Sequence, residues 1–446
     1  MRRTPRTTQD ADSESGSAEH ARPYARHGRL KRFSVPRTIG KSLAVAVGVS
    51  AVASVSVVAV AAGMLVGSAQ PSIDLHPAAA GSTGVQAAAQ APGLGALEGG
   101  FNVLVVGSDS RKGQGEVGFG SEDEETSVLN DVNMLMHVSA DHQSVSVVSF
   151  PRDTYVDIPS CVNPDTGETV SAAYGLKINE ALGRGGLGCV AATIEQLMGI
   201  RVDYGAVVQF NGVIEMSNAV GGVDVCVATE IDDNWTNVHL EPGTHTLQGM
   251  DALQFLRSRH GIGDGSDLTR ISNQQVFLSA LVRKVKSAET LTNPVALYGL
   301  GRATLSNMVL SNELNNVNTL VQMGLALSEV DLAEVVFVQY PTVTVDGGVE
   351  PNVEAAAVLA AALQNDQAIV VTGGTGAGAT TSGTEPAPAA ETPTAETPTA
   401  ETPAEAPTEP AAEPTAVATA PTSVALPESI TGQPADQQTC SVGFFG

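Results

Sequence analysis

The chain has 446 residues and a formal net charge of −25, which is enough length for one large domain with accessory segments. Residues 1–41 hold ten Lys and Arg and four Asp and Glu, so the rest of the chain holds 13 basic and 44 acidic residues. Such an acidic composition argues against a nucleic-acid-binding protein, because binding to phosphate backbones rewards many Lys and Arg contacts.

An uncharged apolar stretch at residues 42–69 follows the basic segment 1–41. As a helix, at roughly 1.5 Å per residue, it exceeds the ~30 Å hydrocarbon core. The basic flank places the N-terminus in the cytoplasm. The alternative is a signal peptide cleaved near Gly67–Ala69, whose apolar region is usually only about 7–15 residues long. We therefore expect a single-pass transmembrane helix in the cell membrane, a flexible linker at 70–99, and an extracytoplasmic domain at 100–370.

Strand and helix patterns alternate through the predicted domain. Apolar runs predict strands at 101–107, 132–138, 145–150, 204–210, 223–227 and 335–339, and a turn at 141–144 joins the second and third as a hairpin. Helical spacing of apolar residues predicts helices at 189–198, 210–220, 271–285 and 352–363. The alternation indicates one α/β domain rather than an all-β sandwich.

Residues 371–446 change composition to Thr, Pro, Glu and Ala, with the repeat Glu-Thr-Pro-Thr-Ala at 391–400. Such a composition buries no core, so we expect a disordered low-complexity tail. Cys440 near its end argues that the last residues tie back to the domain. All four cysteines follow the apolar stretch, and an even number outside the cytoplasm indicates two disulfides, with three pairings open.

Five short segments gather polar residues at predicted strand or helix ends. They are Gly107-Ser-Asp-Ser-Arg111, Asn130-Asp-Val-Asn133, Phe150-Pro-Arg-Asp-Thr-Tyr155, Lys177-Ile-Asn179 and Arg257–Gln274. Each of the first four, taken alone, is also compatible with a capped turn, a surface ion pair or an exposed helix start. The fifth is the most informative, because it holds three of the 13 basic residues beyond residue 41.

In this fifth segment, Asp267, Arg270 and Gln274 are spaced to share one face of a helix over its first two turns. Asp267 fits an N-cap or first-turn position. A helix N-terminus with Arg and Gln on one face is suited to bind an anion, and we expect Arg257 and Arg259 to point to one side of an extended segment before it. The alternative is structural, with Arg270 paired to Asp267.

The order of these segments resembles the LytR–CpsA–Psr family. The matching motifs are Gly-Ser-Asp-Ser-Arg, Asn-Asp-Val-Asn-Met-Leu, Phe-Pro-Arg-Asp-Thr-Tyr, Lys-Ile-Asn, Gly-Gly-Val-Asp-Val, and Phe-Leu-Arg-Ser-Arg-His followed by Asp-Leu-Thr-Arg-Ile-Ser-Asn-Gln. The resemblance covers residues 100–290 and continues to about residue 365. It implies an α/β (α+β sandwich) fold with a central mixed sheet flanked by helices and an apolar groove for a polyprenyl chain.

The resemblance also implies a membrane-anchored phosphotransferase. Such an enzyme moves a glycopolymer from a polyprenyl-pyrophosphate carrier to peptidoglycan or a surface protein, through a phosphodiester and with Mg²⁺ or Mn²⁺. By likeness, Asp109 and Asp131 hold the metal, and with Arg152 and Arg270 they form the catalytic set. The pyrophosphate-binding positions implied are Arg111, Arg152, Lys177, Arg257, Arg259, Asp267, Arg270 and Gln274.

One position departs from the family pattern, because Leu129 stands where many members have arginine. Either Arg111 compensates, or the head group has one contact less. The family likeness further pairs Cys161 with Cys189, and Cys226 with Cys440. Two other classes remain open: a non-catalytic polyprenyl-phosphate-binding envelope regulator, and a wall scaffold whose aspartates only cap turns.

Overall fold

The computed structural model describes residues 71–76, 97–110, 128–164, 166–287, 294–382 and 423–445, without the side chains of 294–298 and 317. All of them lie in one compact unit, residues 60–446. The predicted cytoplasmic segment 1–41 and transmembrane helix 42–69 lie outside the described residues. Among the described helices, none is both long and apolar enough to span a membrane.

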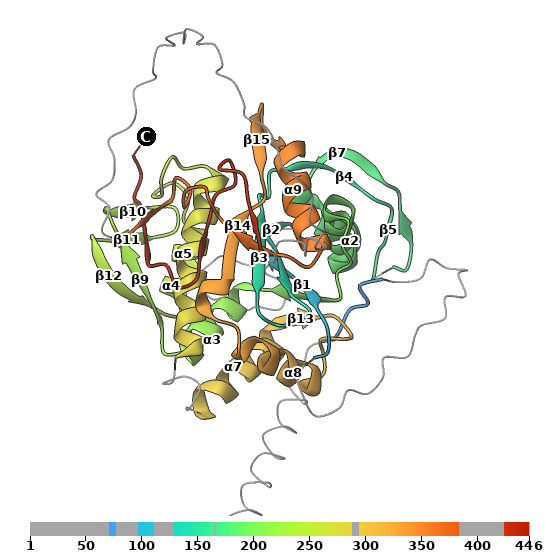
Figure 1. Ribbon diagram of the computed structural model, residues 1–446, viewed down its shortest axis with the longest axis horizontal. Coiled ribbons are helices and arrows are strands. Elements are labelled where there is room, and N and C mark those ends of the chain that lie inside the picture. Colours follow the sequence, from blue (N-terminus) through green and yellow to red (C-terminus); the bar gives the residue numbers. More distant parts are fainter. Residues whose placement is uncertain are drawn as a thin grey trace, which may run out of the picture. The chain divides into compact units, whose positions relative to one another are not determined.

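A seven-stranded mixed sheet forms the centre of this unit (Figure 1). Its order is β13 (Met308–Leu310), β8 (Tyr204–Val208), β1 (Phe101–Ser108), β2 (Asn130–Val138), β3 (Val145–Phe150), β14 (Val335–Gln339) and β20 (Gly432–Pro434). The middle strands β1, β2 and β3 are antiparallel, whereas β8 and β14 add in parallel to β1 and β3. The predicted central mixed sheet and the predicted hairpin are thereby confirmed.

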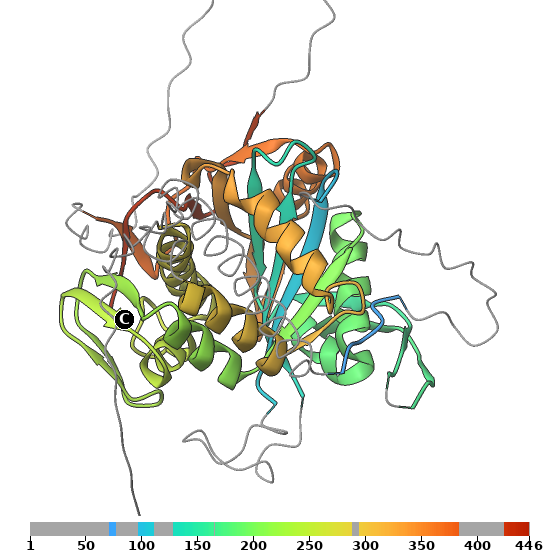
Figure 2. The same ribbon diagram turned by 90° about the horizontal axis from the view of Figure 1, so that it is seen from below.

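Helices cover both faces of the central sheet, because its strands alternate apolar residues to each side. Leu104 and Val106 of β1 face a core shared with α2 (Ala181–Met198) and α9 (Val353–Gln364). Phe101 and Val103 face the other core, which includes residues of α7 (Pro294–Asn307) and α8 (Val317–Ser328). Figure 2 shows α8 running across this second face.

A second, four-stranded sheet packs on α5 (Asp267–Lys286), which stands between the two sheets in Figure 1. Its order is β12 (Gly243–Leu247), β9 (Val223–Val227), β21 (Thr439–Ser441) and β18 (Ala379–Thr381). Two further helices complete the wall that faces the central sheet: α4 (Met250–Arg257) lies beside α5, and α3 (Phe210–Ala219) lies beside α4.

The remaining elements are short. They are the pairs β4 (Tyr155–Ile158) with β7 (Ala173–Lys177), β5 (Cys161–Val162) with β6 (Thr169–Val170), β10 (Ile231–Asp233) with β11 (Val238–Leu240), β15 (Thr342–Val345) with β16 (Gly348–Pro351) and β17 (Ala368–Val370) with β19 (Ser423–Ala425), and the 3₁₀ turns η1 (Ile178–Glu180) and η2 (Leu332–Glu334). None of these was expected from periodicity, because such pairs are too short to show it.

Two predicted boundaries were wrong. The expected disordered tail is ordered at 371–382 and 423–445: β20 extends the central sheet and Ile430 is fully buried. The compositional argument missed this because the last residues are held by partners far away in sequence. The predicted linker also fails at 71–76, since Leu75 is only 2% exposed in the core. Residues 383–422 lie outside the described residues.

Both predicted disulfides are present. Cys161 joins Cys189, and Cys226 joins Cys440 with their Cα atoms 4.4 Å apart. The second bridge links directly paired residues of the parallel strands β9 and β21. It therefore fixes the C-terminal strand against the sheet that supports α5.

Helix α2 is longer than predicted, starting at Ala181 rather than at residue 189. Its first half contains Gly185 and Gly186 in non-helical conformations, Gly186 with a φ of 66°. These glycines interrupt the apolar periodicity and look like a turn in the sequence. A Cβ at Gly185 would lie 2.6 Å from Cβ of Cys161, so close packing at the disulfide accounts for glycine there.

Candidate functional site

Two of the predicted site aspartates, Asp109 and Asp131, lie at the same end of the central sheet. β1 ends where β2 begins, and the register shifts between Gly107 and Ser108, which pair with Val132 and Asn130. Beyond this bulge, the carboxylate Oδ1 of Asp109 accepts a hydrogen bond from the Leu129 N–H at 2.9 Å. The antiparallel pairing therefore places these two residues, 22 positions apart in sequence, at the same end of the sheet.

Arg152 links this edge to α5. It follows β3, and its Nη1 donates to Oδ1 of Asp131 at 2.7 Å. Its backbone N–H donates to Oδ2 of Asp267 at 3.1 Å. Burial lowers the pKa of Arg152, but the nearby Asp131, Asp267 and Asp153 outweigh it and leave the pKa above its ordinary value.

Arg270 is the most buried of the predicted cations, with 5% exposure. Its Nη2 lies 2.6 Å from Oδ1 of Asp267 and donates to the main-chain oxygen of Asp131, also at 2.6 Å. Burial lowers its pKa, which Asp267 and Asp131 only partly oppose, although a guanidinium stays charged in proteins. The ion pair between Arg270 and Asp267, which the sequence left open as a structural alternative, therefore exists and lies within the expected site.

Asp267 occupies the first turn of α5, as one of the two predicted positions requires; the N-cap is Ser266, whose side chain accepts from Thr269 N–H. Asp267 is buried between the backbone of Arg152 and the guanidinium of Arg270. Its carboxylate therefore positions two arginines, and a negatively charged side chain at this location is itself no ligand for an anion.

Lys177 pairs with a residue that the sequence did not single out. Its Nζ donates to Oδ1 of Asp153 at 2.8 Å, and β7 places Lys177 opposite Tyr155 of β4. Burial would raise the pKa of Asp153, but Lys177, Arg152 and Arg259 together hold it below its ordinary value. Asp153 therefore interacts electrostatically with cations from three separate segments of the chain.

Arg257 and Arg259 were expected on one extended segment, and this expectation was wrong for Arg257, which is the last residue of α4. Its guanidinium carbon lies 4.6 Å from the ring centroid of Phe210, within the range of a cation–π contact. Arg259 acts electrostatically on both Asp153 and Arg270. It therefore belongs with a set of interacting charged residues, here called the charged group: Asp131, Arg152, Asp153, Lys177, Arg257, Arg259, Asp267 and Arg270. The helical pattern of α4 was missed because it spans only eight residues.

The position of Arg259 is fixed by Asp233, which sequence reasoning missed. Asp233 is 1% exposed and its Oδ2 accepts hydrogen bonds from Ser258 Oγ at 2.7 Å, from Arg259 N–H at 3.1 Å and from Gly261 N–H at 3.3 Å. Burial would raise its pKa, and these hydrogen bonds lower it below the ordinary value. No local pattern shows that Asp233 holds Arg259, because the partners of its Oδ2 lie 25–28 residues away.

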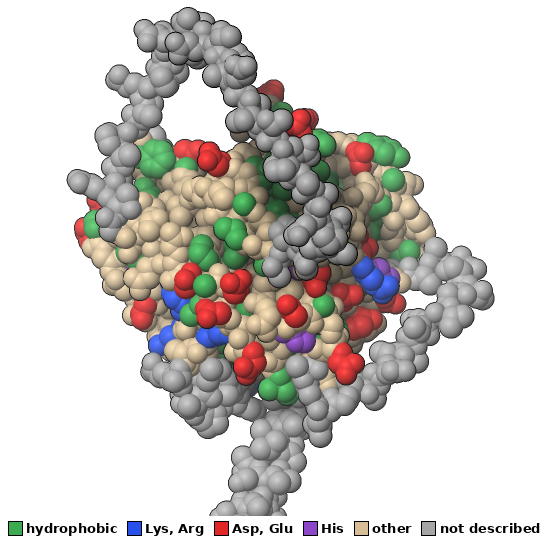
Figure 3. Space-filling view, in the orientation of Figure 1, with side chains coloured by type: hydrophobic (Ala, Val, Ile, Leu, Met, Phe, Trp, Pro, Cys, Tyr) green, Lys and Arg blue, Asp and Glu red, His purple; other side chains and the backbone are tan. Residues whose placement is uncertain are grey.

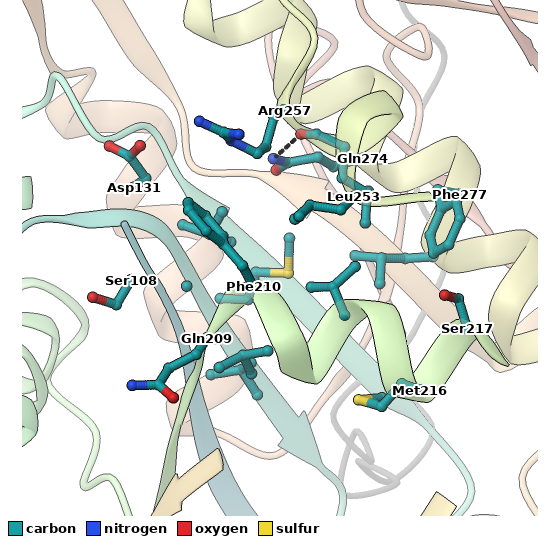
Figure 4. A pocket seen from close by; sticks show the side chains of 18 of the residues that line it. Ser108, Asp131, Gln209, Phe210, Met216, Ser217, Leu253, Arg257, Gln274 and Phe277 are labelled. Atoms are coloured by element: carbon teal, nitrogen blue, oxygen red, sulfur yellow. Dashed lines mark hydrogen bonds between the residues drawn. The ribbon is translucent and has the colours of Figure 1, made fainter. Parts of the chain in front are cut away.

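The charged group lies at one end of an apolar pocket of about 310 Å³. The pocket is enclosed by the central sheet and by α3, α4 and α5, and its lining includes Val105, Met134, Val208, Phe210, Val213, Met216, Leu253, Leu256, Phe277, Leu278, Leu281 and Met308. Asp131, Arg257, Arg270 and Gln274 also line it. In Figure 4, Asp131 and Arg257 stand at one side, and Met216 and Phe277 lie at the other.

Gln274 helps to build this wall. Its Nε2 donates to the main-chain oxygen of Leu256 at 3.1 Å, drawn as the dashed line in Figure 4. This bond ties α5 to α4 close to Arg257. The predicted apolar groove is therefore present as a pocket with one polar end, a shape complementary to a ligand with an anionic head and an apolar tail.

Two predicted features gain no support from geometry. Arg111 lies outside the described residues. Leu129 is half-buried and its main chain exchanges hydrogen bonds with Asp109. Across the described part of the chain, no group of three or more His, Cys, Asp or Glu is arranged to hold a metal ion, so Asp109 and Asp131 stand as a pair of carboxylates.

Basic side chains are sparse on the described surface. The face shown in Figure 3 carries acidic side chains at many points and basic ones at only a few. Against this background, the pocket end gathers Arg152, Lys177, Arg257, Arg259 and Arg270. Three carboxylates, those of Asp131, Asp153 and Asp267, pair with them, and a fourth, that of Asp233, holds the backbone of Arg259. The excess of one positive charge favours an anion.

Comparisons with known proteins identify a family for this chain. The LytR_cpsA_psr family model matches residues 70–368. The cell wall biosynthesis protein LcpA of Corynebacterium glutamicum is 30% identical over 273 residues, which are 56% of this chain and 52% of that protein. The polyisoprenyl-teichoic acid–peptidoglycan teichoic acid transferase TagT of Bacillus subtilis is 30% identical over 198 residues, 43% of this chain and 54% of that protein.

The chain thus spans about half the length of these relatives. Among solved structures, a LytR-Csp2A-Psr enzyme from Actinomyces oris is 21% identical, with a TM-score of 0.44, and covers 60% of this chain and 95% of that chain. Because the family model matches most of the domain that carries the pocket and the charged group, the chain belongs to the LytR–CpsA–Psr family.

Proposed function

We propose that this protein is a glycopolymer phosphotransferase of the cell envelope. Its donor is a glycan on a polyprenyl-pyrophosphate carrier, and its acceptor is peptidoglycan or a surface protein. The observation that supports this most is the union of a buried arginine network with an apolar pocket, because Arg270 both lines the pocket and contacts Asp131 and Asp267. A lipid pyrophosphate combines the same two chemistries.

In this proposal the pocket holds the first isoprene units, and Arg152, Arg257, Arg259 and Arg270 neutralise the pyrophosphate. Guanidinium groups suit this task, since their planar forks bind phosphate oxygens in pairs and keep their charge. Phosphoryl transfer depends mostly on positioning and charge stabilisation. The network of Asp267 and Asp233 prepares that geometry before the substrate binds, because it fixes Arg270 and the backbone of Arg259.

The reaction joins an acceptor hydroxyl oxygen to the sugar-linked phosphorus and breaks the bond from that phosphorus to the bridging oxygen. Polyprenyl phosphate leaves with the bridging oxygen, and a phosphodiester remains between glycan and acceptor. The hydroxyl proton passes to a carboxylate at the sheet edge, Asp109 or Asp131. Asp131 lies beside Arg152, so a base at this edge would stand next to the arginines that hold the pyrophosphate in this proposal.

Magnesium or manganese is a further part of the proposal. Asp109 and Asp131 offer two hard oxygen donors from adjacent strand ends, and Mg²⁺ is commonly held by one or two carboxylates together with substrate phosphate oxygens and water. When bound, the ion would neutralise charge on the pyrophosphate. Because Asp131 already accepts from Arg152, the same carboxylate orients an arginine whether or not the ion is present.

For localisation, we propose that residues 42–69 anchor the protein in the cell membrane with its N-terminus in the cytoplasm and the described unit outside. The two disulfides suit an oxidising compartment. A lipid-linked donor embedded in the same membrane would then reach the pocket without leaving the bilayer surface.

The deciding experiment incubates the detergent-solubilised full chain with a lipid-linked glycan, peptidoglycan and Mg²⁺, and identifies the product by mass spectrometry. We expect a glycan–peptidoglycan phosphodiester from the wild type and none from Arg152→Ala. Arg201→Ala is a matched control, because Arg201 is 74% exposed and lies by Asp203, outside the charged group. Normal ligation by a folded Arg152→Ala protein would refute the site assignment.

A second candidate function is a non-catalytic binder of polyprenyl phosphate that regulates the envelope. Leu129 favours it, since this half-buried apolar residue adds no charge beside Asp109. The two functions differ in one measurement: a binder would retain the lipid pyrophosphate but release no polyprenyl phosphate with any acceptor, whereas a transferase would release it in step with product.

A further inference from the structure

An exposed aromatic pair lies directly beside Arg259 and the turn that follows it, residues 259–266, here called the arginine bend. Trp235 is the only tryptophan of the chain, and it is 81% exposed in the turn between β10 and β11. Its ring stacks on that of His260, with centroids 5.3 Å apart and planes inclined by 28°. His260 directly follows Arg259 of the charged group. A tryptophan so exposed forgoes the burial that its large apolar surface favours, so the exposure calls for a functional reason.

The pair is held in place by the same carboxylate that fixes the arginine bend. Oδ1 of Asp233 accepts from Trp235 N–H at 2.9 Å, while its Oδ2 accepts from the main chain of Arg259 and Gly261. One buried side chain thus couples the turn that carries Trp235 to the bend that carries His260. The aromatic surface is therefore preorganised relative to the anion-binding residues, which reduces the ordering cost of binding a ligand across both.

The C-terminal segment supports the bend from another side. Phe444 N–H donates to the Gly261 main-chain oxygen at 2.9 Å, and Gly443 forms an isolated bridge with Ile262. This segment is fixed three residues earlier by the disulfide of Cys440. Such support keeps an exposed loop rigid, a property expected of a binding platform and unnecessary for a solvent-exposed turn.

We propose that Trp235 and His260 form a subsite for the sugar joined to the donor pyrophosphate. The C–H groups on one face of a pyranose ring form a flat apolar surface that stacks on aromatic rings, and tryptophan offers the largest such area. The order along the protein, from apolar pocket to arginines to aromatic pair, matches the order of polyprenyl chain, pyrophosphate and sugar along the donor. This proposal rests on the proposed function, because it assumes that the arginines hold the pyrophosphate.

The polar surroundings suit the same ligand. Asp232 and His239 of the hairpin pair at 2.7 Å and are more than half exposed, so they present a donor and an acceptor beside the turn. Sugar recognition combines an aromatic face with such groups for the ring hydroxyls. A lipid-surface role fits less well, since Asp232, three residues before Trp235, is acidic and anionic membranes attract basic surfaces.

The first test measures how much the sugar adds to binding. The full chain in detergent micelles is titrated with geranyl pyrophosphate and with the same lipid carrying N-acetylglucosamine or galactose. We expect at least one sugar-bearing lipid to bind the wild type roughly two- to tenfold more tightly than the sugar-free lipid, the range of a single aromatic contact. Trp235→Ala should lose this increment and bind the sugar-free lipid as the wild type does.

Variants then separate stacking from folding. Trp235→Phe should keep part of the increment and His260→Ala should lose part of it. Tyr174→Ala, which removes an aromatic ring that is 77% exposed on β7, should keep all of it. An increment that survives in Trp235→Ala, or no increment with either sugar in the wild type, would overturn the proposal.

Because Trp235 is the only tryptophan, its fluorescence reports on this subsite alone. Tetrameric N-acetylglucosamine and a galactose oligosaccharide, added without any pyrophosphate, should change the emission of the wild type. If neither pyrophosphate ligand binds the wild type, the proposed function fails, and this sugar titration still decides whether the platform exists. A shift to shorter wavelength on adding phosphatidylglycerol, with no response to sugars, would assign the pair to lipid and refute the subsite.

Discussion

Asp267 offers the sharpest test of how the site is built, because it is buried between two arginines. Its side chain is 7% exposed, Oδ1 lies 2.6 Å from Arg270 Nη2, and Oδ2 accepts from the Arg152 N–H. Replacing it by Asn keeps the size and removes the charge. The guanidinium of Arg270, 5% exposed, would then be a buried cation without its nearest counter-charge.

The expected cost follows from that burial. Removing one partner of a buried ion pair destabilises a protein by about 3–5 kcal/mol, whereas an exposed pair contributes about 0–1 kcal/mol. We therefore expect Asp267→Asn to lower the free energy of unfolding by about 3 kcal/mol or more. Asp232→Asn breaks the exposed pair with His239, whose partners are 58% and 54% exposed, and should have an effect below about 1 kcal/mol.

Urea denaturation followed by circular dichroism measures both values. The double variant Asp267→Asn/Arg270→Met removes the buried charge together with its partner, so it should be more stable than Asp267→Asn alone. If Asp267→Asn and Asp232→Asn cost the same, or if the double variant is the least stable of all, then Arg270 does not depend on Asp267 and the preorganised network is refuted.

Three further predictions concern other parts of the unit. Cys440→Ser opens the bridge across 214 residues and should destabilise by up to about 5 kcal/mol in the chain-entropy model, seen as a lower melting temperature; an unchanged melting temperature contradicts a structural role for the C-terminal strand. Asp233→Ala should raise the KM for the lipid donor and also shift Trp235 fluorescence, because it releases both the bend and the turn; a change in neither would separate it from the site. Burial lowers the pKa of His137 below 6.5, so the folded state favours the neutral histidine. The stability that this histidine contributes above about pH 6.5 should therefore fall as the pH drops through the folded pKa. His137→Gln should flatten the pH dependence of urea midpoints between about pH 7 and pH 5, and an identical slope in both proteins would exclude this contribution.

Local patterns predicted the middle of the fold well. The runs of valine at β1, β3 and β14 fall within about one residue of their predicted bounds, and the hairpin of β2 and β3 is as expected. Strands of this kind are dictated by their own residues, since β-branched side chains favour extended backbone and burial. The glycine-interrupted start of α2 and the eight-residue α4 carry weaker periodicity, so their bounds required tertiary contacts.

For the site, the sequence identified most of the residues but few of the contacts between them. Eight of the predicted residues belong to the charged group or to the pocket lining: Asp131, Arg152, Lys177, Arg257, Arg259, Asp267, Arg270 and Gln274. The sequence did not reveal that Asp267 also holds the backbone of Arg152, that Lys177 pairs with Asp153, or that Asp233 holds the backbone of Arg259. Such pairings join residues far apart in the chain, and no local rule supplies them.

The sequence by itself determined the alternation of strands and helices, the concentration of arginine near α5, and the family to which these motifs belong. Only the tertiary structure decided that Asp267 also holds the backbone of Arg152, that the pocket ends at Arg270, and that the last residues add a strand to each of the two sheets. The physical reason is that periodicity and propensity act within a few residues. Ion pairs, pockets and sheet edges, in contrast, form between segments that meet only after the chain has packed.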